Sequence, residues 1–396
     1  MRAGSELYVR DLASRLLQCG HTPIAYSTTL GEVARELREM TVPVIASLDM
    51  LTVPPDIIHG QHHVETMTAL LHFRQVPAIF FCHGWLPWEE IPPHFPRILR
   101  YVAVDHTCRD RLTYEHAIPE ECVRVIFNFV DLQRFNVRPP LPARPKRALV
   151  FSNNMCAATH LGAVQEACAR AGIELDVIGA SVGQPCAQPE QVLGRYDLVF
   201  AKARCALEAL AVGTAVILCD TPGVGPMVTT GELEQLRQLN FGIRTLRDSL
   251  HPDVLTREIA RYDAVDAAEV SRRIRASAGL EAAVDEIVAL YGEVLSEYAT
   301  THVVDAAAEG RAAAAYLRWL PVHLRHERQA VLREVHDERQ AVLHEVHNER
   351  QALLHEVHKS TISRLREHVL RIPLLGPLAR AVVRKVTGPR SGRLTG

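Results

Sequence analysis

Short apolar runs alternate with helical patterns along the first third of the chain. Two of them, VPAIFFC ending at Cys82 and LRYVAV at residues 99–104, are bounded by polar residues, as is typical of strands buried on both faces. Residues 5–19 place several leucines on one helical face and stop before Gly20, and TPIAYST follows as a predicted short strand. This alternation predicts a parallel sheet covered by helices.

A proline-rich segment, RPPLPARPK at residues 138–146, separates this region from a second one with the same alternation. The predicted strands there are RALVFS, IELDVIG, YDLVFA and TAVILCD, with the predicted helices THLGAVQEACARAG and CALEALAVG between them. We therefore expect two α/β lobes, 1–137 and 147–300, joined by 138–146. Ligands of such sheets bind beyond the carboxyl ends of the strands.

The remainder is predicted to be helical, with interruptions near Gly279 and Gly310 and a connector over 301–326. Three copies of an eleven-residue repeat follow at 327–359: ERQAVLREVHD, ERQAVLHEVHN and ERQALLHEVHK. A period of eleven gives about 3.67 residues per turn, which aligns one valine and leucine stripe. Arginines fall inside this stripe, which is costly in a coiled coil; they are Arg328, Arg339 and Arg350. We expect homo-oligomerisation through 327–359, with a single extended helix as the alternative.

The last segment, 360–396, is basic and amphipathic. Within 364–393 the only acid is Glu367, while arginines alternate with leucine, isoleucine and valine. Such a segment is typical of contact with an anionic membrane surface. The alternative is a solubilising tail.

Composition limits the function classes. Apolar residues make up 47% of the chain and charged residues 23%, with a formal net charge of −2, so no strong positive field predicts nucleic-acid binding. The nine cysteines include no C-x-x-C pair, which favours reduced thiols. No signal peptide or run of 18 apolar residues occurs. These features predict a cytoplasmic protein, peripheral at the inner membrane face if the basic tail binds there.

Candidate chemistry concentrates at residues 196–228. A predicted strand ends at Phe200, Lys202 and Arg204 follow, and a helix begins near Cys205. A helix start with two cations is suited to a diphosphate, and Glu208, one turn further, is suited to ribose hydroxyls. The alternative is a solvated surface cluster. This hypothesis requires that Lys202 and Arg204 are not buried against acidic partners. The histidines show no metal-ligand spacing, so no metal site is expected.

Several segments resemble family-4 glycosyltransferases: GSELYVRDLASRLLQCGH, PDIIHGQHH, FFCHG, YVAVDHTCRDRL, VRVIFNFVDLQRF, LEALAVGTAVILCD and LEAAVDEIVALYGEVLSEY. The likeness covers roughly residues 4–298 and implies the GT-B fold of two Rossmann-like lobes. It implies retaining, metal-independent transfer of a sugar, without a cofactor, from a nucleotide-diphosphate donor to a glycan or lipid-linked acceptor. The donor would bind to the second lobe.

The resemblance assigns roles residue by residue. Glu208 matches the ribose contact and His83 the histidine near the donor sugar, while Asn128 and Asp131 match a hinge motif. The family's first motif glutamate is replaced by Phe200, and its basic phosphate motif by FSNNMCAATH, which leaves neutral donors. These donors are Ser152, Asn153 and Asn154.

The family also has an apolar strand before its first helix, whereas this chain starts at Met1, just before that helix. A lobe without this strand would expose backbone groups, so we expect a segment upstream of Met1 rather than a natural deletion. Two other functions stay open: a sugar-nucleotide epimerase on the same fold, which Phe200 disfavours, and a non-catalytic scaffold.

Overall fold

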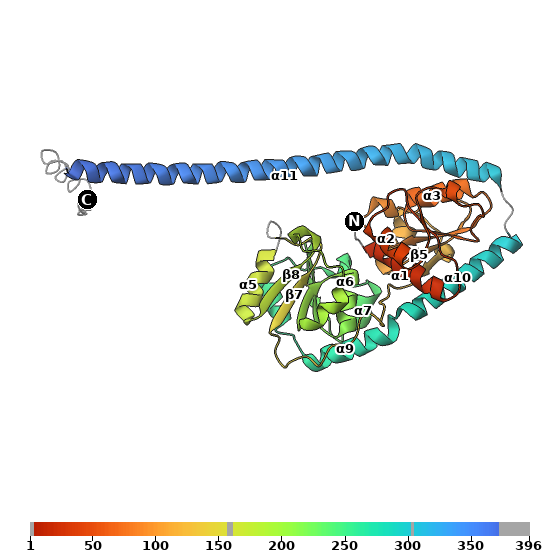
Figure 1. The fold of residues 1–396 in the computed structure, drawn as a ribbon, viewed down its shortest axis with the longest axis horizontal. Helices are drawn as coiled ribbons and strands as arrows, with labels where there is room; N and C mark the ends of the chain where they lie inside the picture. The colour runs from red at the N-terminus through yellow and green to blue at the C-terminus, as the bar shows by residue number, and fades with distance from the viewer. Residues whose placement is uncertain (1–3, 157–160, 302–304, 372–396) are drawn as a thin grey trace, which may run out of the picture. The chain divides into compact units, whose positions relative to one another are not determined.

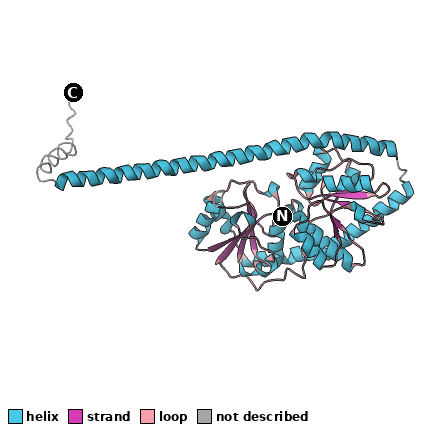
Figure 2. Ribbon diagram, turned by 45° about the horizontal axis from the view of Figure 1, so that its top comes forward, coloured by secondary structure: helices cyan, strands magenta, loops and turns pink. Residues whose placement is uncertain are grey.

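The computed structural model describes residues 4–156, 161–301 and 305–371. The chain divides into two compact units, Met1–Tyr316 and Leu317–Gly396. In the first unit, strands are grouped into sheets flanked by helices, as Figures 1 and 2 show. The unit contains both predicted lobes.

The described residues of the first lobe hold six parallel strands in two separate sheets. β1 pairs with β2, and the larger sheet has the order β3-β4-β5-β6. Its elements are α1 (Gly4–Gln18), β1 (Ala25–Tyr26), α2 (Glu32–Glu39), β2 (Val44–Ile45), β3 (Ile58–Gly60), α3 (His63–His72), β4 (Ala78–Cys82), β5 (Ile98–Ala103), α4 (His106–Asp110) and β6 (Val123–Val125). Among the described residues, no strand joins β1 to β3.

The second lobe has one five-stranded sheet in the order β11-β10-β9-β7-β8. Its elements are β7 (Arg147–Phe151), α5 (Leu161–Ala171), β8 (Glu174–Ile178), β9 (Leu198–Ala201), α6 (Ala203–Val212), β10 (Ala215–Asp220), β11 (Gly223–Met227), α7 (Leu233–Gln238), α8 (Pro252–Ile259) and α9 (Ala264–Ser277). The four strands expected from the sequence are present and parallel. The fifth, β11, is antiparallel to β10 and was not expected, since glycine and proline interrupt its apolar pattern.

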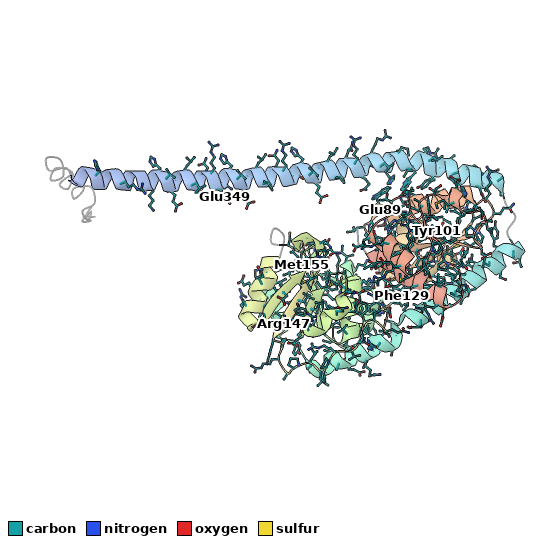
Figure 3. All side chains as sticks on the ribbon, in the orientation of Figure 1. Glu89, Tyr101, Phe129, Arg147, Met155 and Glu349 are labelled. Carbon is teal, nitrogen blue, oxygen red and sulfur yellow. The ribbon has the colours of Figure 1, made fainter. Side chains whose placement is uncertain are left out.

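The chain passes between the lobes earlier than the proline-rich segment indicated. Phe129, labelled in Figure 3, belongs to the core of the first lobe, whereas Val130 and Phe135 belong to that of the second. The predicted linker therefore follows residues that already pack in the second lobe. At this crossing the N–H group of Val130 donates to the carbonyl of Ala278 at 2.8 Å.

The chain returns from the second lobe to the first at Leu280, directly beside Val130. The N–H group of Leu280 donates to the carbonyl of Val130 at 3.0 Å, and α10 (Leu280–Thr301) begins there. The buried face of α10 joins the core of the first lobe, through Val284 and Ile287 among others. The predicted second lobe, 147–300, includes this helix, but α10 packs on the first lobe because its buried apolar side chains belong to that core.

A further helix, α11 (Ala306–Arg371), starts on the first lobe and continues into the second unit. Arg97 Nε donates to Glu309 Oε1 at 2.7 Å, and His63 Nδ1 lies 2.7 Å from the hydroxyl of Tyr316. The predicted interruption near Gly310 is wrong, because α11 passes through this residue. The break near Gly279 is confirmed between α9 and α10.

The second unit contains the three repeats within one continuous helix. Side chains extend from it along its length in Figure 3, where Glu349 is labelled. Its apolar stripe is between 52% and 62% exposed at Val331, Leu332, Val335, Val342, Leu343, Val346, Leu353, Leu354 and Val357. Most of the predicted membrane-contact segment, from residue 372 on, lies outside the described residues. Over the part of the chain that is described, no helix is long and apolar enough to cross a membrane.

Candidate functional site

Asp220 contacts three of the predicted donor-site residues. Its Oδ1 accepts a hydrogen bond from Ser152 Oγ at 2.8 Å, and its Oδ2 accepts one from Asn154 Nδ2 at 3.0 Å. The Nζ atom of Lys202 lies 2.5 Å from the same Oδ2. These residues lie at the ends of β7, β9 and β10 or within three residues after them, and the three strands are neighbours in the sheet. This carboxyl edge is where ligands of such sheets bind.

The Asp220 carboxyl is charged at neutral pH. Burial raises its pKa, but hydrogen bonds from Lys202, Asn154 and Ser152 outweigh burial and hold the pKa below its ordinary value. Asp220 is 1% exposed, whereas the side chain of Lys202 keeps 29% of its surface exposed. Because an ammonium group has three N–H donors, the pairing leaves Lys202 able to bind a second anion.

The turn that carries Lys202 leads directly into α6. This helix has no side-chain cap, and its first-turn N–H groups have no partner within the helix. Ala203 has a φ of 49°, in the left-handed region that favours glycine, and its N–H group donates to the carbonyl of Phe241 at 2.8 Å. Such backbone strain is concentrated at functional sites.

Arg204 lies in a different environment from the one expected. Its Nη2 is paired with Asp11 Oδ2, and its Nε donates to Glu208 Oε1 at 2.8 Å. Asp11 belongs to α1 of the first lobe, so this ion pair joins the two lobes. The hypothesis of two unpaired cations is therefore wrong in this structure, since Arg204 is held by two carboxylates and Lys202 by one. No local sequence pattern indicates the pairing of Arg204 with Asp11, which lies 193 positions away.

The two other predicted donor contacts are placed differently. Glu208 is 4% exposed and holds Arg204 from the next turn of the same helix. Asn153 is outside the Asp220 cluster, because its Oδ1 accepts the N–H group of Ala180 at 3.0 Å. Their roles toward a donor remain predictions.

His83 follows β4 and packs edge-on against Tyr8 of α1, with ring centroids 4.5 Å apart. Burial is the main reason that its pKa falls to about 3, with smaller contributions from His59, His62 and Arg204, so the imidazole is neutral at pH 7. Its Nε2 atom is buried without a hydrogen-bond partner among the described residues. A buried atom of this kind is a candidate contact for a ligand.

Glu90 holds the backbone around His83. Its Oε2 accepts the N–H groups of His83 and Gly84, both at 2.5 Å. Arg111 completes the turn by donating to the carbonyls of Gly84 and Pro87 at 2.6 and 2.9 Å. Burial raises the pKa of the Glu90 carboxyl to about 7 in spite of these hydrogen bonds.

A pocket of about 470 Å³ lies beside the crossing between the lobes, a volume within the range of small-molecule sites. Its wall includes Asp11 from α1, Arg134 from the crossing and Glu190 from the second lobe. Arg134 donates to Asp11 at 3.4 Å and to Glu190 at 3.1 Å. The pocket therefore adjoins the network that holds Arg204.

Sequence reasoning missed the residues that organise the site. Asp220 carried a signal, because it is a charged residue at the end of the apolar run AVILCD. Asp11 and Glu90 carried no such signal, because each lies in a segment with other charged residues. Asp11 pairs with the distant Arg204, and Glu90 binds backbone N–H groups, which no sequence pattern marks. Among the described residues, no group of three histidines, cysteines or carboxylates could hold a metal ion.

Comparisons with known proteins find a family likeness in the first lobe and a fold likeness over most of the chain. The sequence profile "Glycosyltransferase Family 4" matches residues 2–134, a range that ends shortly after the crossing at Val130. A comparison with curated proteins finds no match.

Three structures of HepE from Anabaena are similar to the chain, each at 14% sequence identity and over 74% of this chain. The complex with UDP-glucose has a TM-score of 0.55 and is covered over 97% of its length. The complex with UDP has a TM-score of 0.52 and the complex with UDP and glucose 0.51, each covered over 96%. The chain is therefore similar in fold to these GT-B structures, and its first lobe is similar in sequence to the family-4 glycosyltransferases.

Proposed function

We propose that the chain transfers a sugar from a nucleoside-diphosphate donor to a hydroxyl group of a glycan or lipid-linked acceptor, with retention and without a metal ion. The observation that carries the proposal is the Asp220 assembly. It fixes Lys202 beside the first turn of α6, at the carboxyl edge of the second-lobe sheet. The HepE structures are complexes with UDP-glucose and with UDP, which supports a nucleotide sugar as donor.

The chemistry asked of these residues is electrostatic. Negative charge develops on the leaving diphosphate, and a cation held in advance by a buried carboxylate stabilises it without reorganisation. In the proposed arrangement Lys202 and the N–H groups of Arg204 and Cys205 contact the diphosphate, and Glu208 contacts the ribose. Neutral His83 contacts the donor sugar through its buried Nε2.

One observation favours the scaffold alternative. Both predicted phosphate-binding cations are ion-paired with carboxylates of the chain itself, and Arg204 has two such partners. A protein that binds no donor has no need to keep these cations available. The two functions are therefore separated by ligand binding and turnover.

The test is incubation of the purified full-length protein with UDP-sugars and GDP-sugars, with and without a panel of glycan and lipid-linked acceptors. Nucleoside diphosphate release that depends on an acceptor supports sugar transfer. Accumulation of an isomeric sugar nucleotide supports the epimerase. If neither UDP nor GDP binds and no sugar nucleotide is consumed, the transferase proposal is wrong and the scaffold function stands.

We also propose that the repeat helix joins copies of this chain. The stripe at 327–359 is exposed over all three repeats, and a second copy is the partner that presents the same eleven-residue spacing. Glutamates such as Glu338 border this stripe on one side, so they are available to the arginines within the partner's stripe. Contact of 364–393 with an anionic membrane, at the cytoplasmic face, remains a proposal from the sequence.

A further inference from the structure

Asp11 lies at the centre of an ion-pair network between the lobes. Its Oδ1 accepts hydrogen bonds from Arg10 at 2.6 Å and from Arg134 at 3.4 Å, and its Oδ2 is paired with Arg204. Arg10 is also held by Glu36 of α2, at 3.0 Å. Three cations thus surround one carboxylate.

This carboxylate is buried and charged. Asp11 is 5% exposed. Burial raises its pKa, but Arg204 and Arg10 outweigh burial, and the pKa lies below its ordinary value. A negative charge therefore remains on Asp11 at neutral pH, next to a guanidinium that follows the proposed phosphate-binding turn.

Two anions would compete for Arg204 in this arrangement. Arg204 lies two residues after Lys202, in the first turn of α6, where the proposed function places the diphosphate of the donor. A guanidinium forms its strongest contacts with carboxylates and phosphates through the same N–H donors. The diphosphate and Asp11 would therefore meet the same guanidinium, and the diphosphate can take the Nη2 donors of Arg204 only if Asp11 releases them.

We propose that Asp11 is an internal competitor of the donor diphosphate for Arg204. Without donor, the carboxylate holds Arg204 and joins α1 to α6. A bound diphosphate takes Arg204 from Asp11, which stays paired with Arg10 and Arg134. The proposal rests on the proposed function and adds a residue of the first lobe that lowers donor affinity and couples donor binding to the contact between the lobes.

The experiment measures binding of UDP and of GDP by titration calorimetry to the full-length protein. Asp11→Asn keeps the size of the side chain and removes its charge. We expect the dissociation constant of the better-bound nucleotide to fall about tenfold, the usual size of such coupling. A role confined to stability would lower the melting temperature of the variant without tightening nucleotide binding.

Glu36→Gln is the matched control. Glu36 belongs to the same network, where its carboxylate contacts Arg10. Because this carboxylate does not hold Arg204, we expect the dissociation constant of the nucleotide to change less than about twofold. Asp11→Asn should also lose its effect in an Arg204→Gln background. Arg244, 2.5 Å from Asp110, provides a second ion pair between the lobes in all of these variants.

The outcomes separate the two proposals. Unchanged or weaker binding by folded Asp11→Asn, with wild-type binding intact, overturns the competitor role alone. Absence of UDP and GDP binding in both proteins overturns the proposed function and the competitor role together. If Asp11→Asn does not fold, hydrogen exchange of the wild type decides: the amides of α1 should exchange faster with saturating UDP or GDP, and slower or equal exchange overturns the proposal.

Discussion

The guanidinium of Arg97 contacts the carboxylate of Glu309, with Nε 2.7 Å from Oε1, although 212 positions separate the two residues. Arg97 is 1% exposed and also donates to the carbonyls of Phe73 and Val76. We expect Glu309→Gln to lower the free energy of unfolding by about 3 kcal/mol, because removing one partner leaves a buried charge unpaired. Denaturant unfolding followed by circular dichroism measures this change.

The control is Glu297→Gln, which breaks the ion pair with Arg100. The Glu297 side chain is 38% exposed, so its loss should cost less than about 1 kcal/mol. Equal costs for the two variants would show that Arg97 does not anchor the start of α11.

Lys202→Ala should lower turnover at least about tenfold, because it removes a preorganised cation from the leaving diphosphate. It should also lower the free energy of unfolding, because it leaves the buried Asp220 carboxylate without its cation. Lys146→Ala is the matched control, since this exposed lysine precedes β7 at the opposite edge of the same sheet. Initial rates of nucleoside diphosphate release check the prediction. Arg204→Ala should lower both turnover and stability, because it also leaves Asp11 and Glu208 without their shared partner.

Acid should destabilise the fold through His59. Burial lowers its pKa to about 3, so it is neutral in the folded protein, stacked 4.3 Å from Phe81. In the unfolded chain His59 binds a proton below about pH 6.5, whereas in the folded protein it stays neutral down to about pH 3. The free energy of unfolding is therefore unaffected by His59 above pH 6.5 and falls by about 1 kcal/mol per pH unit between 6.5 and 3. His59→Asn should flatten the dependence of unfolding free energy on pH, and His21→Asn, at an exposed position, should leave it unchanged.

Glu90 should act in the opposite direction. Its pKa of about 7 exceeds that of a glutamate in the unfolded chain. The stability that protonated Glu90 contributes to the fold is therefore fully present below about pH 4.5 and is lost as the pH rises through 7. Glu90→Gln keeps an acceptor for the N–H groups of His83 and Gly84 without a buried charge. We expect it to be more stable than the wild type by about 1–3 kcal/mol at pH 8 and not at pH 4.5. A constant difference across this range would contradict the assignment.

The repeat stripe should hold copies of the chain together. Val342→Glu combined with Val346→Glu places two charges in the stripe and should shift the protein to monomer in light scattering after gel filtration. Gln340→Glu combined with His344→Glu adds the same number of acids on the opposite face of the helix. If both pairs of substitutions behave alike, the stripe is not the interface.

Much of the fold was predictable because buried strands need continuous apolar runs. Residues 76–82 and 214–220 were expected as strands and are observed as β4 and β10. β11 was missed, since Gly223, Gly225 and Pro226 break its pattern. The lobe against which α10 packs could not be predicted, because an apolar stripe on a helix is compatible with either of the two cores.

The site was predictable only in part. Ser152, Asn154 and Lys202 meet because the carboxyl ends of parallel strands share one edge, which the strand pattern implies. Arg204 and Asp11 are 193 positions apart in the sequence and belong to different lobes, so their pairing depends on how the two lobes pack. Local patterns contain no information about that approach.

The crossing at Val130 and Leu280 has a consequence for synthesis on the ribosome. The second lobe, from residue 130 to residue 279, is continuous in sequence and emerges complete, whereas the core of the first lobe also requires Val284, Ile287 and Val294 from α10. Domains generally fold as units during synthesis. The second lobe should therefore be the earlier one to resist protease on stalled nascent chains, and the first lobe should acquire resistance only after α10 has left the exit tunnel.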